Sequence, residues 1–454
     1  MSEAKVQDNL NPYLEGNYAP VAEEVTATDL QVMGELPKEL NGRYLRIGPN
    51  PLNPDPKSHH WFSGDGMVHG ICLKDGNAQW YRNRYVGSTN LSEFRGASDI
   101  PGVNWNDSPS GPNTNVGGFA GKTWAVVEAG GCPVELNYEL ETVGRNNFEG
   151  TLPGAFTAHP KIDPVSGEMH AMTYAWAEWL DHVQYVVVAK DGRVRKTVDI
   201  PLPGMSMVHD MSITEKYVVI YDQPVTVDID AAMAGSSFPL RWNPDYGNRV
   251  GFMPREGEAK DITWVDVPLG YCFHPMNAYD LANGDVILDL CIYDKMFDSD
   301  QLGPFGDGMA KLERWTVSVT NRSITTAVID SRPNEFPRIR GAVNGKPYRY
   351  GYCSSPSMDD PLAGWPTIKH DLQTGDQTTF DHGIGKAAGE PVFVGKSGRS
   401  EEDAGWLMTY VHDLSSGTTE FVIIDAEDFG RGYVARVLLP QRVPFGFHGN
   451  WARD

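Results

Sequence analysis

The sequence is poor in cysteine and contains no long apolar run. Its five cysteines form no CxxC pair and no evenly spaced framework. This excludes a disulfide scaffold and predicts free, mostly buried thiols in a reducing compartment. No stretch approaches the roughly 18–20 apolar residues that span a bilayer, and residues 1–20 lack the apolar core of a secretion signal. We therefore expect a cytoplasmic protein.

Concentrated positive charge and nucleotide-binding motifs are also missing. The formal net charge is −22, which argues against a nucleic-acid binder because nothing basic is dense enough to neutralise phosphates. The glycine-rich stretches "GDGMVHG" (64–70) and "GPFGDG" (303–308) do not match GxGxxG, and neither a Walker A motif nor a GxSxG elbow occurs. The sequence thus predicts no nicotinamide or nucleoside triphosphate site.

Helical periodicity is scarce, and short β-rich runs separated by turns take its place. The ranges 75–86, 185–200 and 421–440 each read as a strand, a turn and a second strand, with Asp191-Gly192 as the turn of the second. No linker or change of composition divides the chain. We expect one domain over residues 1–454, an all-β, seven-bladed β-propeller with roughly 60 residues per blade. A pair of β-sandwiches is the alternative.

Four of the twelve histidines share a context of apolar or small neighbours near predicted strand ends. Two of them precede proline, which favours an extended backbone, and a buried imidazole needs a partner. Taken singly, each is more often a hydrogen-bonded histidine than a ligand. Their separations of 50, 65 and 174 residues exclude a zinc finger or an HExxH pair, but suit a fold that gathers remote strands at one axis. A site of neutral imidazoles suits Fe, Zn, Cu or Ni. The four are His159, His209, His274 and His448.

Ten motifs in order along nearly the whole chain resemble those of the carotenoid cleavage oxygenases. This resemblance implies a seven-bladed β-propeller with loop insertions that form a cap over the metal face, and an Fe(2+) ion held by the four histidines. The motifs are "LNGRYLRIGPNP", "HHWFSGDGMVHG", "NTNV", "AVVEAGGCPVEL", "TAHPKIDPVSGEMH", "VHDMSIT", "FHPMNAYD", "NEFPRI", "GEPVFV" and "FHGNW".

The resemblance also implies three glutamates outside the ligands and a threonine beside the metal. Glu128, Glu335 and Glu390 would accept hydrogen bonds from His209, His274 and His448 respectively, because a carboxylate on the far nitrogen keeps a ligating imidazole neutral and aimed. Thr114, in "NTNV", would crowd one coordination position and leave one opening for dioxygen. An ordinary strand threonine is the alternative.

The implied reaction cleaves a C=C bond with O2 into two carbonyl products and needs no external reductant, in keeping with the missing nucleotide motifs. In the hydroxystilbene cleavers of the family a lysine precedes the first glutamate, but here that residue is Val127. This favours a carotenoid or apocarotenoid, with a lignostilbene or hydroxystilbene as the alternative. We expect Trp61, Phe62 and Phe297 to line the substrate tunnel. The segment 231–242 would form its mouth or a peripheral membrane contact.

Two other classes compete with the oxygenase. A zinc hydrolase would need a general base beside the metal and would work without oxygen. A non-catalytic propeller would tolerate loss of the histidines. Metal content and oxygen dependence separate all three.

Overall fold

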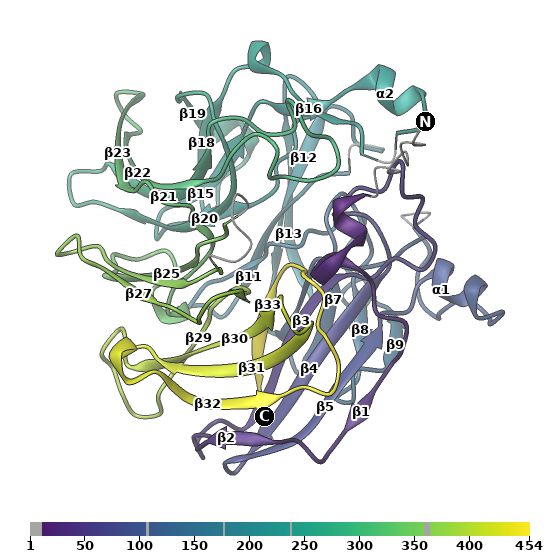
Figure 1. Cartoon of the computed structure of the whole chain (residues 1–454). Helices are drawn as coiled ribbons and strands as arrows, with labels where there is room; N and C mark the ends of the chain where they lie inside the picture. The colour runs from purple at the N-terminus through teal and green to yellow at the C-terminus, as the bar shows by residue number, and fades with distance from the viewer. Residues whose placement is uncertain (1–10, 106–108, 176–177, 237, 358–363) are drawn as a thin grey trace, which may run out of the picture.

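The protein is built almost entirely from short antiparallel strands. The computed structural model describes residues 11–105, 109–175, 178–236, 238–357 and 364–454. In these ranges, seven sheets of at least four strands follow one another around an axis. The colour runs round this ring until the last strands lie beside the first (Figure 1). The predicted seven-bladed β-propeller is therefore confirmed, and the pair of sandwiches was wrong.

The first four blades use the N-terminal half of the chain together with its last strand. They consist of β1 (Thr26–Ala27), β5 (Asn77–Tyr85), β4 (Gly66–Lys74), β3 (Gly42–Pro49) and β33 (Gly449–Arg453); β6 (Asn115–Phe119), β7 (Lys122–Val126), β8 (Val134–Leu136) and β9 (Thr142–Arg145); β10 (Lys161–Ile162), β11 (Met169–Thr173), β12 (His182–Val188) and β13 (Val194–Pro201); and β14 (Met211–Ile213), β15 (Tyr217–Asp222), β18 (Arg249–Pro254) and β19 (Thr263–Asp266).

The remaining three blades use the C-terminal half and one N-terminal strand. They consist of β20 (Tyr271–Asp280), β21 (Val286–Tyr293), β22 (Lys311–Ser318) and β23 (Ser323–Asp330); β24 (Glu335–Arg338), β25 (Tyr350–Ser354), β26 (Thr367–Asp371) and β27 (Gln377–Phe380); and β28 (Lys386–Ala388), β29 (Val392–Gly395), β30 (Gly405–Asp413), β31 (Thr418–Asp425), β32 (Tyr433–Leu438) and β2 (Val32–Gly34).

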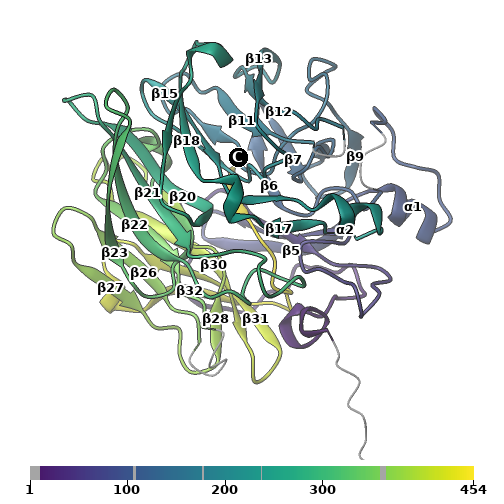
Figure 2. The ribbon, with the colours of Figure 1, turned by 90° about the horizontal axis from the view of Figure 1, so that it is seen from above.

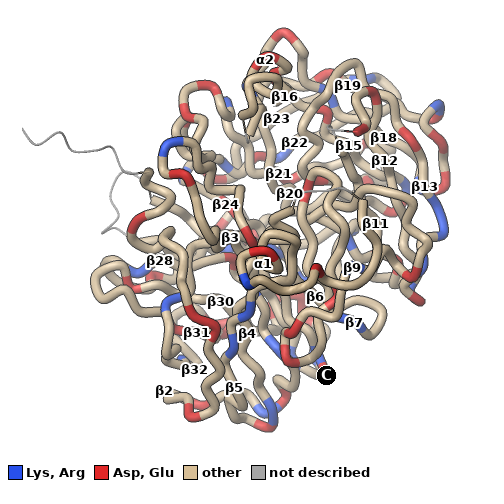
Figure 3. The backbone as a smooth tube through the Cα atoms, turned by 90° about the vertical axis from the view of Figure 1, so that its right-hand side faces the viewer, with Lys and Arg blue, Asp and Glu red and all other residues tan. Residues whose placement is uncertain are grey.

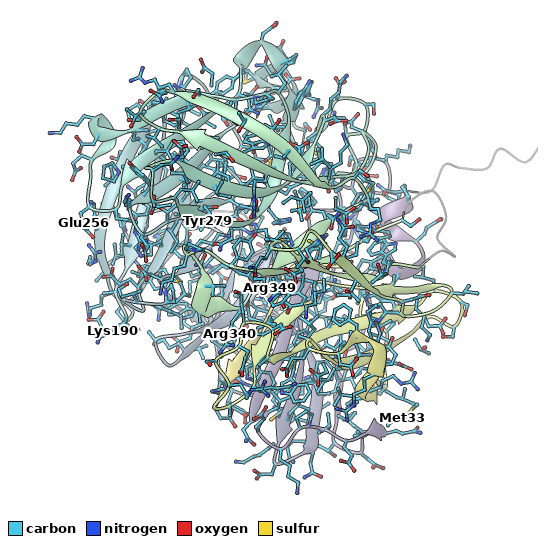
Figure 4. The ribbon with its side chains drawn as sticks, turned by 90° about the vertical axis from the view of Figure 1, so that its left-hand side faces the viewer. Met33, Lys190, Glu256, Tyr279, Arg340 and Arg349 are labelled. Carbon is cyan, nitrogen blue, oxygen red and sulfur yellow. The ribbon has the colours of Figure 1, made fainter. Side chains whose placement is uncertain are left out.

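Both ends of the chain close the ring. β33 pairs with β3, with Trp451 opposite Tyr44, and becomes the inner strand of the first blade. β2 pairs with β32, with Val32 opposite Val437, and becomes the outer strand of the last blade. Met33 of β2 lies at the outer edge of the molecule (Figure 4). The inner strand β33 also contacts β6 and β29 of the neighbouring blades, so the first, second and last blades meet at the closing strand.

Turn chemistry accounts for the hairpins. Asp75 (φ 49°) and Gly76 (φ 76°) both adopt positive φ between β4 and β5, which is the backbone of a type I′ turn and suits an Asp-Gly pair. The hairpin predicted over 185–200 is confirmed as β12 and β13. Its turn at Gly192 (φ 85°) is closed by a hydrogen bond from the Gly192 amide to the carbonyl of Ala189.

The cores lie between blades, where neighbouring sheets pack face to face. Between the fourth and fifth blades, for example, Val219 and Phe252 belong to one cluster with Leu288 and Trp315. All eight residues of β21 are buried, as a strand covered on both faces requires. The five cysteines are free and buried, which confirms their prediction as buried thiols.

Among the described residues, few elements lie outside the seven blades. These are the helices α1 (Thr89–Phe94) and α2 (Ile229–Met233), the strand pair β16 (Val225–Val227) and β17 (Leu240–Trp242), and the 3-10 turns Pro12–Leu14, Gly16–Tyr18, Pro244–Tyr246, Ala259–Asp261, Gly341–Val343 and Phe429–Arg431 (Figure 2).

The surface and the helices give two further results. No helix in the described ranges is long and apolar enough to cross a membrane. Basic positions are scattered among acidic ones along the outer loops (Figure 3).

Candidate metal centre

Each blade contributes one residue near the axis of the propeller, and this residue lies at or near the beginning of the innermost strand of the blade. Because the inner strands surround one axis, residues that are hundreds of positions apart in sequence become neighbours there. In ring order, these residues are Thr114, His159, His209, His274, Glu335, Glu390 and His448. Glu128 joins them from the end of β7.

The local setting of the histidines differs from the prediction that they end strands. His159, His209 and His448 precede β10, β14 and β33 instead. His159 is followed by Pro160, which has no N–H to donate to a sheet ladder, so the strand begins after it. His274 lies inside β20, where the pairing register shifts around Pro275 for the same reason.

The four imidazoles converge. In five of the six pairs the ring centroids lie 4.3 to 5.2 Å apart, and Nε2 of His209 is 3.4 Å from Nε2 of His274. His159, His209 and His448 are only 5–7 % exposed. Buried imidazole nitrogens that face one another without a shared ligand would lack partners, which is unfavourable. The geometry is therefore that of a ligand-binding site.

Three carboxylates contact the outward-facing nitrogens. Nδ1 of His209 lies 2.5 Å from Oε1 of Glu128, and Nδ1 of His274 lies 2.6 Å from Oε2 of Glu335. In the third contact, Nδ1 of His448 lies 3.0 Å from Oε1 of Glu390. The structure thus places each predicted glutamate beside the histidine with which the resemblance paired it. The contacts of His274 and His448 are hydrogen bonds, and an Nδ1–H donated to a carboxylate leaves Nε2 with a free lone pair.

Further contacts fix the glutamates themselves. Tyr174 donates its hydroxyl to Oε2 of Glu128 at 2.7 Å, whose Oε1 also lies 3.0 Å from Nε2 of His159. The Phe336 amide donates to Oε2 of Glu335 at 2.7 Å. Sequence reasoning missed both, because a tyrosine among many and a backbone N–H carry no sequence signal.

Glu390 is held from two sides. The Gly449 amide donates to its Oε2 at 2.8 Å, and Nε of Arg338 lies 3.7 Å from its Oε1. Burial alone would raise the pKa of Glu390, but Arg338 and His448 together lower it to about 2. The carboxylate therefore stays charged, which it must do to orient an imidazole.

The pKa values of the candidate ligands shift in different directions. Burial and the neighbouring imidazoles hold the pKa of His159 well below its usual value, and burial lowers that of His448. Burial also acts to lower the pKa of His274, but Glu335 outweighs it, so that the pKa is raised. A metal-ligating imidazole must be neutral, and in His159 and His448 burial favours that form.

Both the donor atoms and the charges fit a divalent cation. One group of mutually close potential ligands consists of His159, His274 and His448, and a second consists of Glu128, His159 and His209. Imidazole nitrogens bind Fe, Zn, Cu and Ni. The carboxylates of Glu335 and Glu390, whose pKa values lie below their usual range, place negative charge around the imidazoles, and a divalent ion would offset this charge.

A cavity of about 350 Å³ opens onto the histidines. Thr114, Trp61 and Phe62 line it, as do Val127 and Phe238. Thr114 donates its hydroxyl to Oδ1 of Asn113 at 2.8 Å, and its carbonyl accepts the His448 amide at 3.2 Å. Thr114 therefore lies directly beside a candidate ligand.

Phe297 was wrongly predicted to line this cavity. It is 1 % exposed and is absent from the cavity lining, and its ring packs behind those of Phe62 and Phe238, with centroids at 6.1 and 4.8 Å. Phe238, which the prediction named only within the segment 231–242, forms the wall in its place. Loops rather than strands supply Phe62, Phe238 and Phe305, which agrees with the expected cap over the metal face.

Comparison with known proteins agrees with this geometry. The family model described as "Retinal pigment epithelial membrane protein" matches residues 18–453. A carotenoid cleavage oxygenase of Mycobacterium tuberculosis is 41% identical, over 100% of this chain and 99% of its own length. The chain belongs to the carotenoid cleavage oxygenase family. Membership favours the oxygenase over the zinc hydrolase and the non-catalytic propeller.

Other members of the family are similar over nearly the whole chain. A carotenoid 9,10(9′,10′)-cleavage dioxygenase of Crocus sativus is 32% identical, over 97% of this chain and 89% of its own. The crystal structure of Pseudomonas brassicacearum lignostilbene dioxygenase matches with a TM-score of 0.86 and 27% identity, covering 98% of both chains. That of cobalt-substituted Synechocystis ACO matches with 0.84 and 25%, covering 96% of this chain and 98% of its own.

Replacing one histidine of this family member should separate metal binding from folding. We expect His274→Ala to lose bound metal while keeping its melting temperature within a few degrees, because the blades pack without the centre. The matched control is His170→Ala, which removes a buried histidine that contacts Tyr185 and Arg255 instead. The control should keep its metal but melt at a lower temperature. Metal analysis and thermal unfolding check both, and full metal occupancy in His274→Ala would contradict the site.

Proposed function

We propose that the protein is an Fe(2+)-dependent dioxygenase that cleaves a C=C bond of a carotenoid or apocarotenoid with O2, giving two carbonyl products. The observation that carries this proposal is the convergence of four imidazoles at a cavity with aromatic walls. His159, His209, His274 and His448 would hold the metal, and Glu128, Glu335 and Glu390 would orient three of them.

The residues present fit a ferrous ion. Four neutral imidazoles add no charge of their own, and the carboxylates of Glu335 and Glu390 outside them suit a divalent cation. When bound, a ferrous ion supplies the redox chemistry that allows dioxygen to react with an alkene. The atoms and electrons balance without a reductant, since the C=C bond and the O–O bond break and two C=O bonds form.

The chain's own residues position the alkene and exclude water. Trp61 and Phe62 pack against each other and against Phe447, with ring centroids at 5.0–5.8 Å, and all three line the cavity. A stiff aromatic wall holds an apolar chain in one orientation, and orientation is the main contribution that a protein makes to such a step. Thr114, beside His448, would restrict the opening left for dioxygen.

The cavity wall favours a polyene over a phenol. Val127 lines the cavity, and none of the described residues that line it is a lysine or an arginine, so no cation faces a phenolate. The relatives of Mycobacterium tuberculosis and Crocus sativus are named for carotenoid cleavage. A hydroxystilbene is the second candidate, because the lignostilbene dioxygenase structure matches closely and the Tyr293 side chain also lines the cavity.

Labelled dioxygen tests both the reaction and the substrate. We expect the ferrous protein, given ¹⁸O2 with equal amounts of an apocarotenal and a hydroxystilbene, to label both carbonyl fragments of the apocarotenal, as read by mass spectrometry. In the same assay Val127→Lys should cleave the apocarotenal at least about 10-fold more slowly, because an ammonium group in an apolar pocket costs several kcal/mol.

The outcomes separate the two substrates. If only the hydroxystilbene yields labelled fragments, the iron chemistry stands and the polyene assignment is wrong. If neither substrate is labelled by a protein with full iron occupancy, the proposed reaction is wrong.

We further propose that the protein is cytoplasmic and touches membranes through the segment 231–242 to collect its substrate. Two exposed apolar side chains of α2 support this, Met233 inside the segment at 84% exposure and Ile229 two residues before it at 52%. Phe238 and Leu240 of the same segment line the cavity. An apolar surface beside a cavity for an apolar ligand suits entry from a lipid phase.

Sedimentation with liposomes tests the contact. Ile229→Ser with Met233→Ser should reduce the bound fraction several-fold. The control Val165→Ser changes an equally exposed apolar residue (77%) in the turn after β10 and should bind like wild type. Equal binding by both variants would count against the segment.

A further inference from the structure

In three of the four candidate ligands Nδ1 faces the carboxylate of a glutamate. In the fourth, His159, Nδ1 faces the carboxylate of an aspartate instead. His209, His274 and His448 each turn Nδ1 to a glutamate. His159 has no glutamate on that side, but its Nδ1 lies 3.7 Å from Oδ2 of Asp210. Asp210 directly follows another candidate ligand, His209, in the sequence.

The Asp210 carboxylate is buried and held in place from both oxygens. Its side chain is 2% exposed. Oδ1 accepts the Met211 amide at 2.5 Å, and Oδ2 accepts a hydrogen bond from Nζ of Lys161 at 2.7 Å. Lys161 lies two residues beyond His159. The ion pair therefore joins the segments that carry two of the four ligands, at the starts of β10 and β14.

We propose that Asp210 is the fourth orienting carboxylate of the metal centre, a positioning residue for His159 whose pull on the imidazole is limited by Lys161. The inference rests on the metal centre proposed above. At 3.7 Å the carboxylate acts on His159 mainly through its charge, since a hydrogen bond to nitrogen is normally 2.7–3.2 Å long.

The pairing with Lys161 distinguishes Asp210 from the three glutamates. A buried carboxylate needs compensation, and here the compensating cation contacts the same oxygen that faces His159. The pair adds no net charge to the centre, so the match to a divalent ion is unchanged. Asp210 therefore acts on Nδ1 of His159 more weakly than the glutamates act on their imidazoles, while Nε2 of His159 lies 3.0 Å from Oε1 of Glu128. Removal of Lys161 should strengthen the effect of Asp210.

Opposite effects of two substitutions test the proposal. Asp210→Asn keeps the shape but removes the charge, and we expect it to weaken metal binding by about 10–100-fold, the usual loss for an outer partner. Lys161→Met removes the cation from Asp210, so that the carboxylate acts on His159 only. This variant should bind metal at least as tightly as wild type, although the unpaired carboxylate lowers its melting temperature. Asp210→Glu retains the charge and should recover part of the lost affinity.

The measurement is the dissociation constant of Fe(2+), and separately of Co(2+), obtained by competition with a chelator for the full-length protein. The matched control is Asp222→Asn, which removes a fully buried carboxylate paired with Arg249 at 2.8 Å in the same blade. It should bind metal like wild type.

Each result decides the question. If Asp210→Asn and Lys161→Met weaken metal binding equally, the pair only ties two strands together and the proposal is wrong. The same holds if Asp210→Asn binds metal like the control. Absence of metal binding by the wild type would instead overturn the proposed metal centre itself.

Discussion

The contact between a buried carboxylate and Nδ1 of an imidazole is the interaction on which the centre depends. Without it, each buried imidazole could rotate or exchange tautomers, and four Nε2 atoms would not point at one place. The carboxylates are costly to bury, and the structure offsets the cost with backbone amides, Phe336 N–H for Glu335 and Gly449 N–H for Glu390. The centre is therefore built from residues in or directly beside strands of the blades.

The strand that closes the propeller also brings the last candidate ligand into the centre. His448 immediately precedes β33, the strand that closes the ring by pairing with β3. The ring cannot close without bringing His448 beside His274, at 4.9 Å between ring centroids. Most strands pair with their neighbours in sequence, whereas the pairs β3–β33 and β2–β32 join the two ends of the chain. Such long-range pairs are slow to form, so the site is complete only when the ends have met.

The sequence allowed prediction of what local chemistry determines, and little of what packing determines. His274 and Glu335 sit in short motifs and could be named in advance, as could the Asp191-Gly192 turn. Tyr174 and Asp210 could not, because their roles follow from which segments meet across blades. Phe297 and Phe238 show the same limit, since aromatic side chains in a β-rich chain look alike until the packing decides which of them faces the cavity.

X-ray absorption at the iron edge of the anaerobically loaded protein tests the account most directly. The account predicts one iron per chain whose protein ligands are four imidazole nitrogens, with the carboxylates outside the coordination sphere. A spectrum that requires a carboxylate oxygen from the protein would contradict it. Glu128 would then be a ligand, as its closeness to both His159 and His209 allows, and would not orient either imidazole.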